Sequence, residues 1–224
     1  MKSVRFEGFH PDIFNFLSEL NQNPKPEWFN SNRKRYEELF LLPARVLISE
    51  LAPFLHSISP DIRTEPKINI TIKKQFPDAR FNPDAKLRDY FLIHFGRFSG
   101  DPEFFIYLNK DEIQIGLDIN NKSMRNNFFR KNRNNHPEQL DNLFLSTGIN
   151  KQYALYKLGD PPVELVNSFD ISKHAGFLNN YDRLLFQKVF LKDSPFIFTS
   201  ALLGVSVEIF TQLTPLYHFS TSQR

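Results

Sequence analysis

The spacing of apolar residues changes along the chain, and this change restricts the possible folds more than any other feature. Over about 10–56 apolar residues recur every three or four positions, as on one face of a helix, beginning with Ile13, Phe16 and Leu20. Over about 67–118 they alternate with polar residues, as in strands with one buried face. Helical segments followed by a run of strands predict an α+β fold.

Short connections in the middle of the chain predict that the strands are antiparallel. The two best-defined strands are separated by Asn109-Lys110-Asp111, which is too short for a helical crossover. We therefore expect an antiparallel sheet of four to six strands packed against N- and C-terminal helices. The expected strands are 68–72, 90–95, 104–108, 112–118 and 153–158.

The length of 224 residues suits one domain, and we expect a single domain over 1–224. Its 25 phenylalanines predict a core rich in aromatic rings. We expect three parts: an N-terminal helical block at about 10–56, a sheet core at about 67–118 and a helical C-terminal part at about 121–213. Helices in the last part are expected at 122–132, 137–146 and 200–213.

Several classes of function are disfavoured by what the sequence lacks. The chain has no cysteine, which excludes disulfides, thiol nucleophiles and thiolate metal sites. It contains no glycine-rich phosphate loop, no GxSxG nucleophile motif and no HExxH zinc motif. The six histidines are scattered and form no pair at metal-ligand spacing. We therefore predict no metal site and no cofactor.

Localisation is inferred from the same kind of evidence. The first residues lack the apolar core of a secretory signal, and the most apolar stretch, 195–207, is shorter than a membrane span. We expect a cytoplasmic protein with no membrane partner. The formal net charge of +3 is too small to indicate a polyanionic partner by itself.

Two segments together resemble a known family. They are FHPDIFNFLSELNQNPKPEWFNSNRKRYEELFLLPA at 9–44 and KKQFPDARFNPDAKLRDY at 73–90. Both are similar to the bacterial domain of unknown function family 2461, with Lys74 and Pro77 standing where that family usually has arginine. The resemblance implies an α+β fold in a bacterial protein, and it implies no reaction, substrate or cofactor.

The loop at 78–90 is the leading candidate for a binding site. It concentrates charged and aromatic side chains, and arginines suit bidentate recognition of carboxylate or phosphate. We further expect Arg33 and Tyr36 of the N-terminal block to lie beside this loop and frame one pocket. The alternative is a structural network of ion pairs that only holds the loop. The candidate ligand-binding residues are Asp78, Arg80, Asp84, Lys86, Arg88, Tyr90, Arg33 and Tyr36.

Three functions follow as hypotheses. The first is a cytoplasmic binding protein for an anionic small molecule or polymer, which the loop at 78–90 would bind through Arg80, Arg88 and Arg33. The second is a hydrolase or phosphoryl-group enzyme in which Asp78 and Asp84 act as acid and base or hold a cation. The third is a nucleic-acid-associated protein that uses a basic helix, for which the alternative is a solvated surface. The nucleic-acid candidates are Lys122, Arg125, Arg130 and Arg133.

Overall fold

The computed structural model describes residues 5–76, 86–122, 127–159 and 161–223. The chain divides into two compact units, which are described separately. Unit 1 comprises Met1–Phe95, Ile106–Ile113 and Phe190–Val207, and unit 2 comprises Gly96–Phe105, Gln114–Val189 and Glu208–Arg224. The expectation of a single domain over 1–224 stays a prediction.

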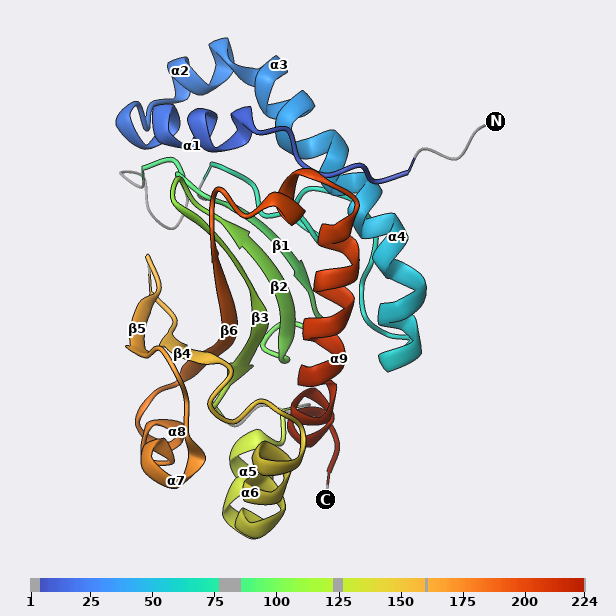
Figure 1. Ribbon diagram of the computed structural model, residues 1–224, viewed down its shortest axis with the longest axis vertical. Helices are drawn as coiled ribbons and strands as arrows, with labels where there is room; N and C mark the ends of the chain where they lie inside the picture. Colours follow the sequence, from blue (N-terminus) through green and yellow to red (C-terminus); the bar gives the residue numbers. More distant parts are fainter. Residues whose placement is uncertain (1–4, 77–85, 123–126, 160, 224) are drawn as a thin grey trace. The chain divides into compact units, whose positions relative to one another are not determined.

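Among the described residues, six strands form one antiparallel sheet in the order β1-β2-β3-β6-β4-β5. This sheet, with helices before and after it in the chain, confirms the α+β fold (Figure 1). Within unit 2, β4 pairs antiparallel with both β5 and β6. The strands are β1 (Phe91–Phe95), β2 (Glu103–Leu108), β3 (Glu112–Asn120), β4 (Ala154–Lys157), β5 (Val163–Val166) and β6 (Arg183–Leu191).

The N-terminal helices of unit 1 pack through phenylalanines, as the composition predicts. Phe40 stacks on Phe91 of β1 with ring centroids 4.1 Å apart, and Phe16 and Tyr36 also contact the Phe91 ring. Such rings remove a large apolar area from water. The N-terminal helices of unit 1 are α1 (Asp12–Gln22), α2 (Pro26–Ser31), α3 (Arg33–Tyr36), the π-helix η1 (Glu37–Leu41) and α4 (Leu42–Ile58). Near the C-terminus, unit 1 also contains the short 3-10 helix η2 (Pro195–Phe198) and the start of α9 (Ala201–Thr221).

The π-helix η1 lies directly before Pro43, which occupies the first turn of α4. In a continuous α-helix Pro43 would leave the carbonyl of Leu39 without a donor, and its ring would press on that carbonyl. A wider turn before the proline relieves this conflict. The helical stretch therefore continues from α3 into α4, and it carries residues 33, 37 and 41 along one side.

The strand expected at 68–72 is wrong. Residues 69–71 form a tight turn in which the carbonyl of Lys67 accepts hydrogen bonds from the amides of Ile70, Thr71 and Ile72. Asn69 has a φ of 68°, a left-handed conformation that asparagine tolerates better than most residues. The alternation of isoleucines with polar residues therefore reflects a turn, and only Ile72 makes a bridge to Ile93 of β1.

Besides the end of α9, the described part of unit 2 contains four helices, and it contains strands where the sequence predicted a helical C-terminal part. Within 121–213 the structure places β4, as expected, and also β5 and β6. The central strand β6 was missed because its first half is a continuous buried run without alternation. The helices are α5 (Phe129–Asn135), α6 (Pro137–Ser146), α7 (Ile171–His174) and α8 (Phe177–Asn180), with α5 lying against α6 (Figure 1).

Two long helical stretches differ from the sequence predictions: one is longer than expected, and the other has the length and apolar composition of a membrane span. Helix α9 continues past Pro215 to Thr221, and the side chains of Leu216, Tyr217 and Phe219 beyond the proline are buried. The stretch Arg33–Ile58 is long and apolar enough to cross a membrane by length and composition alone. Core helices pass the same test, and 44% of its most apolar window is buried inside the protein.

Candidate functional site

The centre of the predicted loop, including Asp78, Arg80 and Asp84, lies outside the described residues. The expected neighbourhood of Arg33 and Arg80 therefore stays a prediction. The rest of the loop is described: Lys86 is exposed and Tyr90 packs on the ring of Tyr107 with centroids 5.0 Å apart.

The two segments that flank residues 77–85 are tied to each other. The Nη1 atom of Arg88 donates to the carbonyl of Lys74 at 2.9 Å, and the amide of Arg88 donates to the carbonyl of Gln75 at 3.1 Å. The side-chain amide of Gln75 donates in turn to the carbonyls of Arg88 and Tyr90, at 3.0 and 2.8 Å. Arg88 thus contributes to holding the base of the loop through backbone carbonyls. Whether the loop is a binding site or a network of ion pairs stays a prediction.

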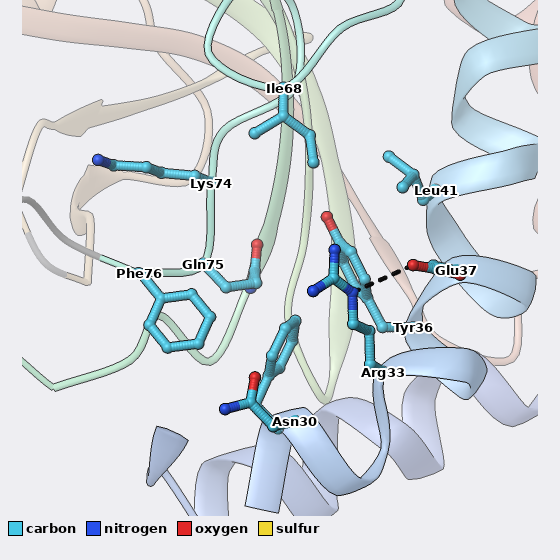
Figure 2. Close-up of a pocket in the computed structure, with 10 residues that line it drawn as sticks. Asn30, Arg33, Tyr36, Glu37, Leu41, Ile68, Lys74, Gln75 and Phe76 are labelled. Atoms are coloured by element: carbon cyan, nitrogen blue, oxygen red, sulfur yellow. Dashed lines mark hydrogen bonds and ion pairs between the residues drawn. The ribbon is translucent and has the colours of Figure 1, made fainter. Parts of the chain in front are cut away.

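A cavity of about 230 Å³ lies beside this loop base, entirely within unit 1. We call it the unit 1 cavity. The π-helix, α3 and the end of α2 form one wall and the segment 68–76 forms the other (Figure 2). Both predicted N-terminal residues, Arg33 and Tyr36, therefore lie at one cavity with the start of the signature segment. The cavity is lined by Phe29, Asn30, Arg33, Tyr36, Glu37, Leu41, Ile68, Lys74, Gln75 and Phe76.

The cavity wall is largely apolar. Phe29 and Leu41 are buried, while Ile68 and Phe76 are more than a third exposed. Phe29 and Phe76 meet edge to face with ring centroids 5.4 Å apart. Exposed apolar side chains around a concave surface are typical of a site that buries part of a small molecule.

Tyr36 places a neutral hydroxyl in this wall. Its side chain is buried, and in Figure 2 its hydroxyl points into the space between Ile68 and Leu41. Burial raises the pKa of Tyr36 to about 12. The hydroxyl is therefore protonated at neutral pH and available as a hydrogen-bond donor.

Gln75 is the buried polar residue of the cavity that the sequence did not indicate. It is 3% exposed, and its Oε1 atom has no hydrogen-bond partner among the described residues. Figure 2 shows this oxygen directed into the same space as the Arg33 guanidinium and the Tyr36 hydroxyl. Nothing in the sequence distinguished Gln75, because an uncharged side chain in a charged segment gives no signal.

Arg33 and Glu37 form an accessible charged pair at the cavity. The Nε atom of Arg33 lies 3.2 Å from Oε1 of Glu37, one helical turn away, and their side chains are 71% and 44% exposed. The neighbouring pair, Lys34 and Glu38, has the same spacing at 3.8 Å but does not line the cavity. Lys74 lines the cavity with its stem, and its ammonium points away from the other polar groups (Figure 2).

The predicted basic helix at 122–132 is wrong in its start, because α5 begins at Phe129. The side chain of Asn127 accepts a hydrogen bond from the amide of Phe129 and donates to the carbonyl of Asn120, which ties the chain to the end of β3 before the helix begins. Arg125 lies outside the described residues. The nucleic-acid hypothesis itself stays a prediction.

The remaining basic candidates of unit 2 differ in their surroundings. Arg133 is half-buried and donates to the carbonyl of Leu178 and, at 3.3 Å, to Oδ1 of Asn121. Arg130 is exposed, and Lys122 pairs with Asp182 at 3.1 Å. Lys122 also lines a second cavity of about 440 Å³, together with Asn120, Lys157, Leu158, Tyr181, Asp182 and Arg183.

No three histidine, aspartate or glutamate side chains in the described part of the chain converge as a metal site requires. In a comparison with protein families, the family described as "Conserved hypothetical protein (DUF2461)" matches residues 12–219. No curated protein matches the chain. The family match confirms the resemblance of the segments 9–44 and 73–90 and extends it over almost the whole sequence.

Proposed function

Because the chain belongs to the DUF2461 family of conserved hypothetical proteins, and because this membership implies no reaction, we propose a function from the geometry of the site. In this proposal, unit 1 binds a small anionic molecule in the unit 1 cavity. Arg33 provides the positive charge and the neutral hydroxyl of Tyr36 provides a second donor. The apolar wall buries the rest of the ligand.

This proposal rests on the hydrogen bonds of the Arg33 guanidinium, which leave part of it available. Three arginines of unit 1 can be compared. Arg88 is bonded to the carbonyl of Lys74, and Arg35 is bonded to Asp12 and Glu19. Arg33 donates only through Nε to Glu37 among the described residues, which leaves its two terminal nitrogens for a ligand. Those nitrogens form the fork that recognises carboxylate or phosphate.

Anion titrations of paired variants test the proposal. Calorimetric titration with isocaproate, hydrocinnamate and inorganic phosphate should show binding of at least one of them to the wild type. Arg33→Gln should weaken that binding roughly three- to tenfold, since the lost contact is charge-assisted but partly screened by water. Tyr36→Phe, which keeps the ring and removes the hydroxyl, should also weaken it.

Lys34→Gln is the matched control, because it removes the same charge one residue away on α3 from a side chain outside the cavity. It should leave the affinity within about a factor of two, as expected for a screened distant charge. Equal losses in Arg33→Gln and Lys34→Gln would mean that only overall charge is sensed. That result, or no loss in Arg33→Gln, would refute a site at this cavity.

A further inference from the structure

The charged pair at the unit 1 cavity limits which anions fit it well. Arg33 and Glu37 are both accessible, and their Nε and Oε1 atoms are 3.2 Å apart. A bare anion that approaches Arg33 is attracted by the guanidinium and repelled by the adjacent carboxylate. A ligand that carries a positive charge beside its negative one meets both groups favourably. The pair thus matches a zwitterion better than a simple anion.

Gln75 adds a requirement for a hydrogen-bond donor. Its amide nitrogen is already used by the carbonyls of Arg88 and Tyr90, so its orientation is fixed. Its Oε1 atom can only accept a hydrogen bond. This atom is buried and has no hydrogen-bond partner within the described residues. A buried acceptor without a partner is unfavourable, and a ligand that supplies an N–H group satisfies it.

The dimensions and wall of the cavity set the rest of the ligand. A volume of about 230 Å³ corresponds to about eight water molecules at roughly 30 Å³ each, hence to a ligand of on the order of ten non-hydrogen atoms. The side chains of Phe29, Leu41, Ile68 and Phe76 favour an apolar body of that size.

Resting on the proposed function, we infer that the unit 1 cavity binds a zwitterionic amino carboxylate with an apolar side chain. The carboxylate of the ligand accepts from the terminal nitrogens of Arg33. Its ammonium donates to Oε1 of Gln75, and the negative charge of Glu37 stabilises it. The apolar side chain lies against the aromatic and aliphatic wall.

Three probes separate these contributions in calorimetric titrations. L-Leucine carries both charges, isocaproate lacks the amino group and isoamylamine lacks the carboxylate. The wild type should bind L-leucine at least about tenfold more tightly than either analogue, a factor equal to about 1.4 kcal/mol. Repeating the comparison with L-phenylalanine and hydrocinnamate guards against a poor fit of one side chain.

Glu37→Gln gives a result that a merely structural role would not produce. It should weaken L-leucine binding and strengthen isocaproate binding, because the same carboxylate attracts the ammonium and repels the bare acid. Glu38→Gln, in the neighbouring pair, should change neither. Parallel shifts for both probes in Glu37→Gln would overturn the assigned role of Glu37.

The outcomes separate this inference from the proposed function. If isocaproate and hydrocinnamate bind the wild type as tightly as the amino acids, and Arg33→Gln weakens them, the cavity is a simple anion site and the inference fails alone. If neither the amino acids nor any of the anions bind, both fail together. Tight binding of isoamylamine alone would also overturn both.

Discussion

Gly8 has a backbone conformation that residues with a side chain rarely adopt. Its φ is 105°, and a Cβ atom there would overlap the backbone of Phe198 and Thr199 at the end of η2. The close approach allows the next residue, Phe9, to donate its amide to the carbonyl of Ile197 at 3.0 Å. Gly8 therefore joins the N-terminal segment of unit 1 to a segment almost 190 residues later in the chain.

Gly8→Ala should lower the free energy of unfolding by at least about 2 kcal/mol, because it adds both a strained φ and a steric overlap. Gly204→Ala is the matched control on the exposed side of α9, where an added Cβ meets no atom within 4 Å. It should stabilise by about 0.5–1 kcal/mol through helix propensity. Urea unfolding monitored by circular dichroism measures the free energy of unfolding of both variants. Equal changes in the two variants would contradict the special role of the Gly8 backbone.

At the unit 1 cavity, sequence reasoning found Arg33 and Tyr36 but not Glu37 and Gln75. Arg33 and Tyr36 were identified because helical spacing and the family resemblance both single out their segment. Gln75 and Glu37 matter through an unpaired oxygen and a neighbouring charge, and these depend on which atoms meet in space. A sequence pattern reports residue types and spacing, and it does not report whether a hydrogen bond is already used.

Among the elements of unit 1, α1 and α3 are joined by one arginine. Arg35 donates to both carboxylate oxygens of Glu19, at 2.8 and 3.1 Å, and to Asp12 at 3.1 Å, and its guanidinium lies 5.4 Å from the centre of the Phe16 ring. Hydrogen bonds from Asn15 and Arg35 keep the pKa of Asp12 below its usual value. The stabilisation by Asp12 is therefore present above its unfolded pKa of 3.8 and is lost as the pH falls through the lower folded value.

Arg35→Gln should lower the free energy of unfolding by on the order of 1 kcal/mol at neutral pH, since it breaks a partly buried network and removes packing on Phe16. Arg33→Gln, two residues away with a mostly exposed pair, should change it by less than about 0.5 kcal/mol. Urea titrations at pH 7 compare them. The test is which variant loses more free energy of unfolding. A larger loss in Arg33→Gln than in Arg35→Gln would contradict the conclusion that the terminal nitrogens of Arg33 are available for a ligand.

Periodicity predicted the long elements and failed where local geometry or burial on two faces decides. Helix α1 shows the expected spacing because it has one buried and one exposed face. The hairpin of β2 and β3 was found through its short turn, although residues on both faces of these strands are buried. The turn at 69–71 imitates a strand because Asn69 accepts a positive φ. Strand β6 shows no alternation in its first half because consecutive residues there, which point to opposite faces of the sheet, are all buried.

For the whole molecule, the main question raised by composition is whether the apolar stretch Arg33–Ile58 enters a membrane. Its start is crowded with charges at 33–38, and Arg45 and Glu50 interrupt its apolar part. Glu50 is used inside the protein, where it accepts a hydrogen bond from the amide of Phe6 at 3.0 Å. The most apolar side of the stretch is fully buried inside the protein, at Leu47, Ile48, Leu51 and Leu55.

A helix whose apolar side is already covered gains nothing by moving into lipid, and it would have to carry Arg45 and Glu50 with it at a cost of about 2.5–3.5 kcal/mol for each charge near the bilayer centre. We therefore expect the native protein to stay at the bottom of a density gradient when mixed with neutral phosphatidylcholine vesicles. Protein unfolded in urea and diluted into vesicles should float in part, because its apolar residues are then exposed. Flotation of the native protein would show that the core of unit 1 opens to release this helix.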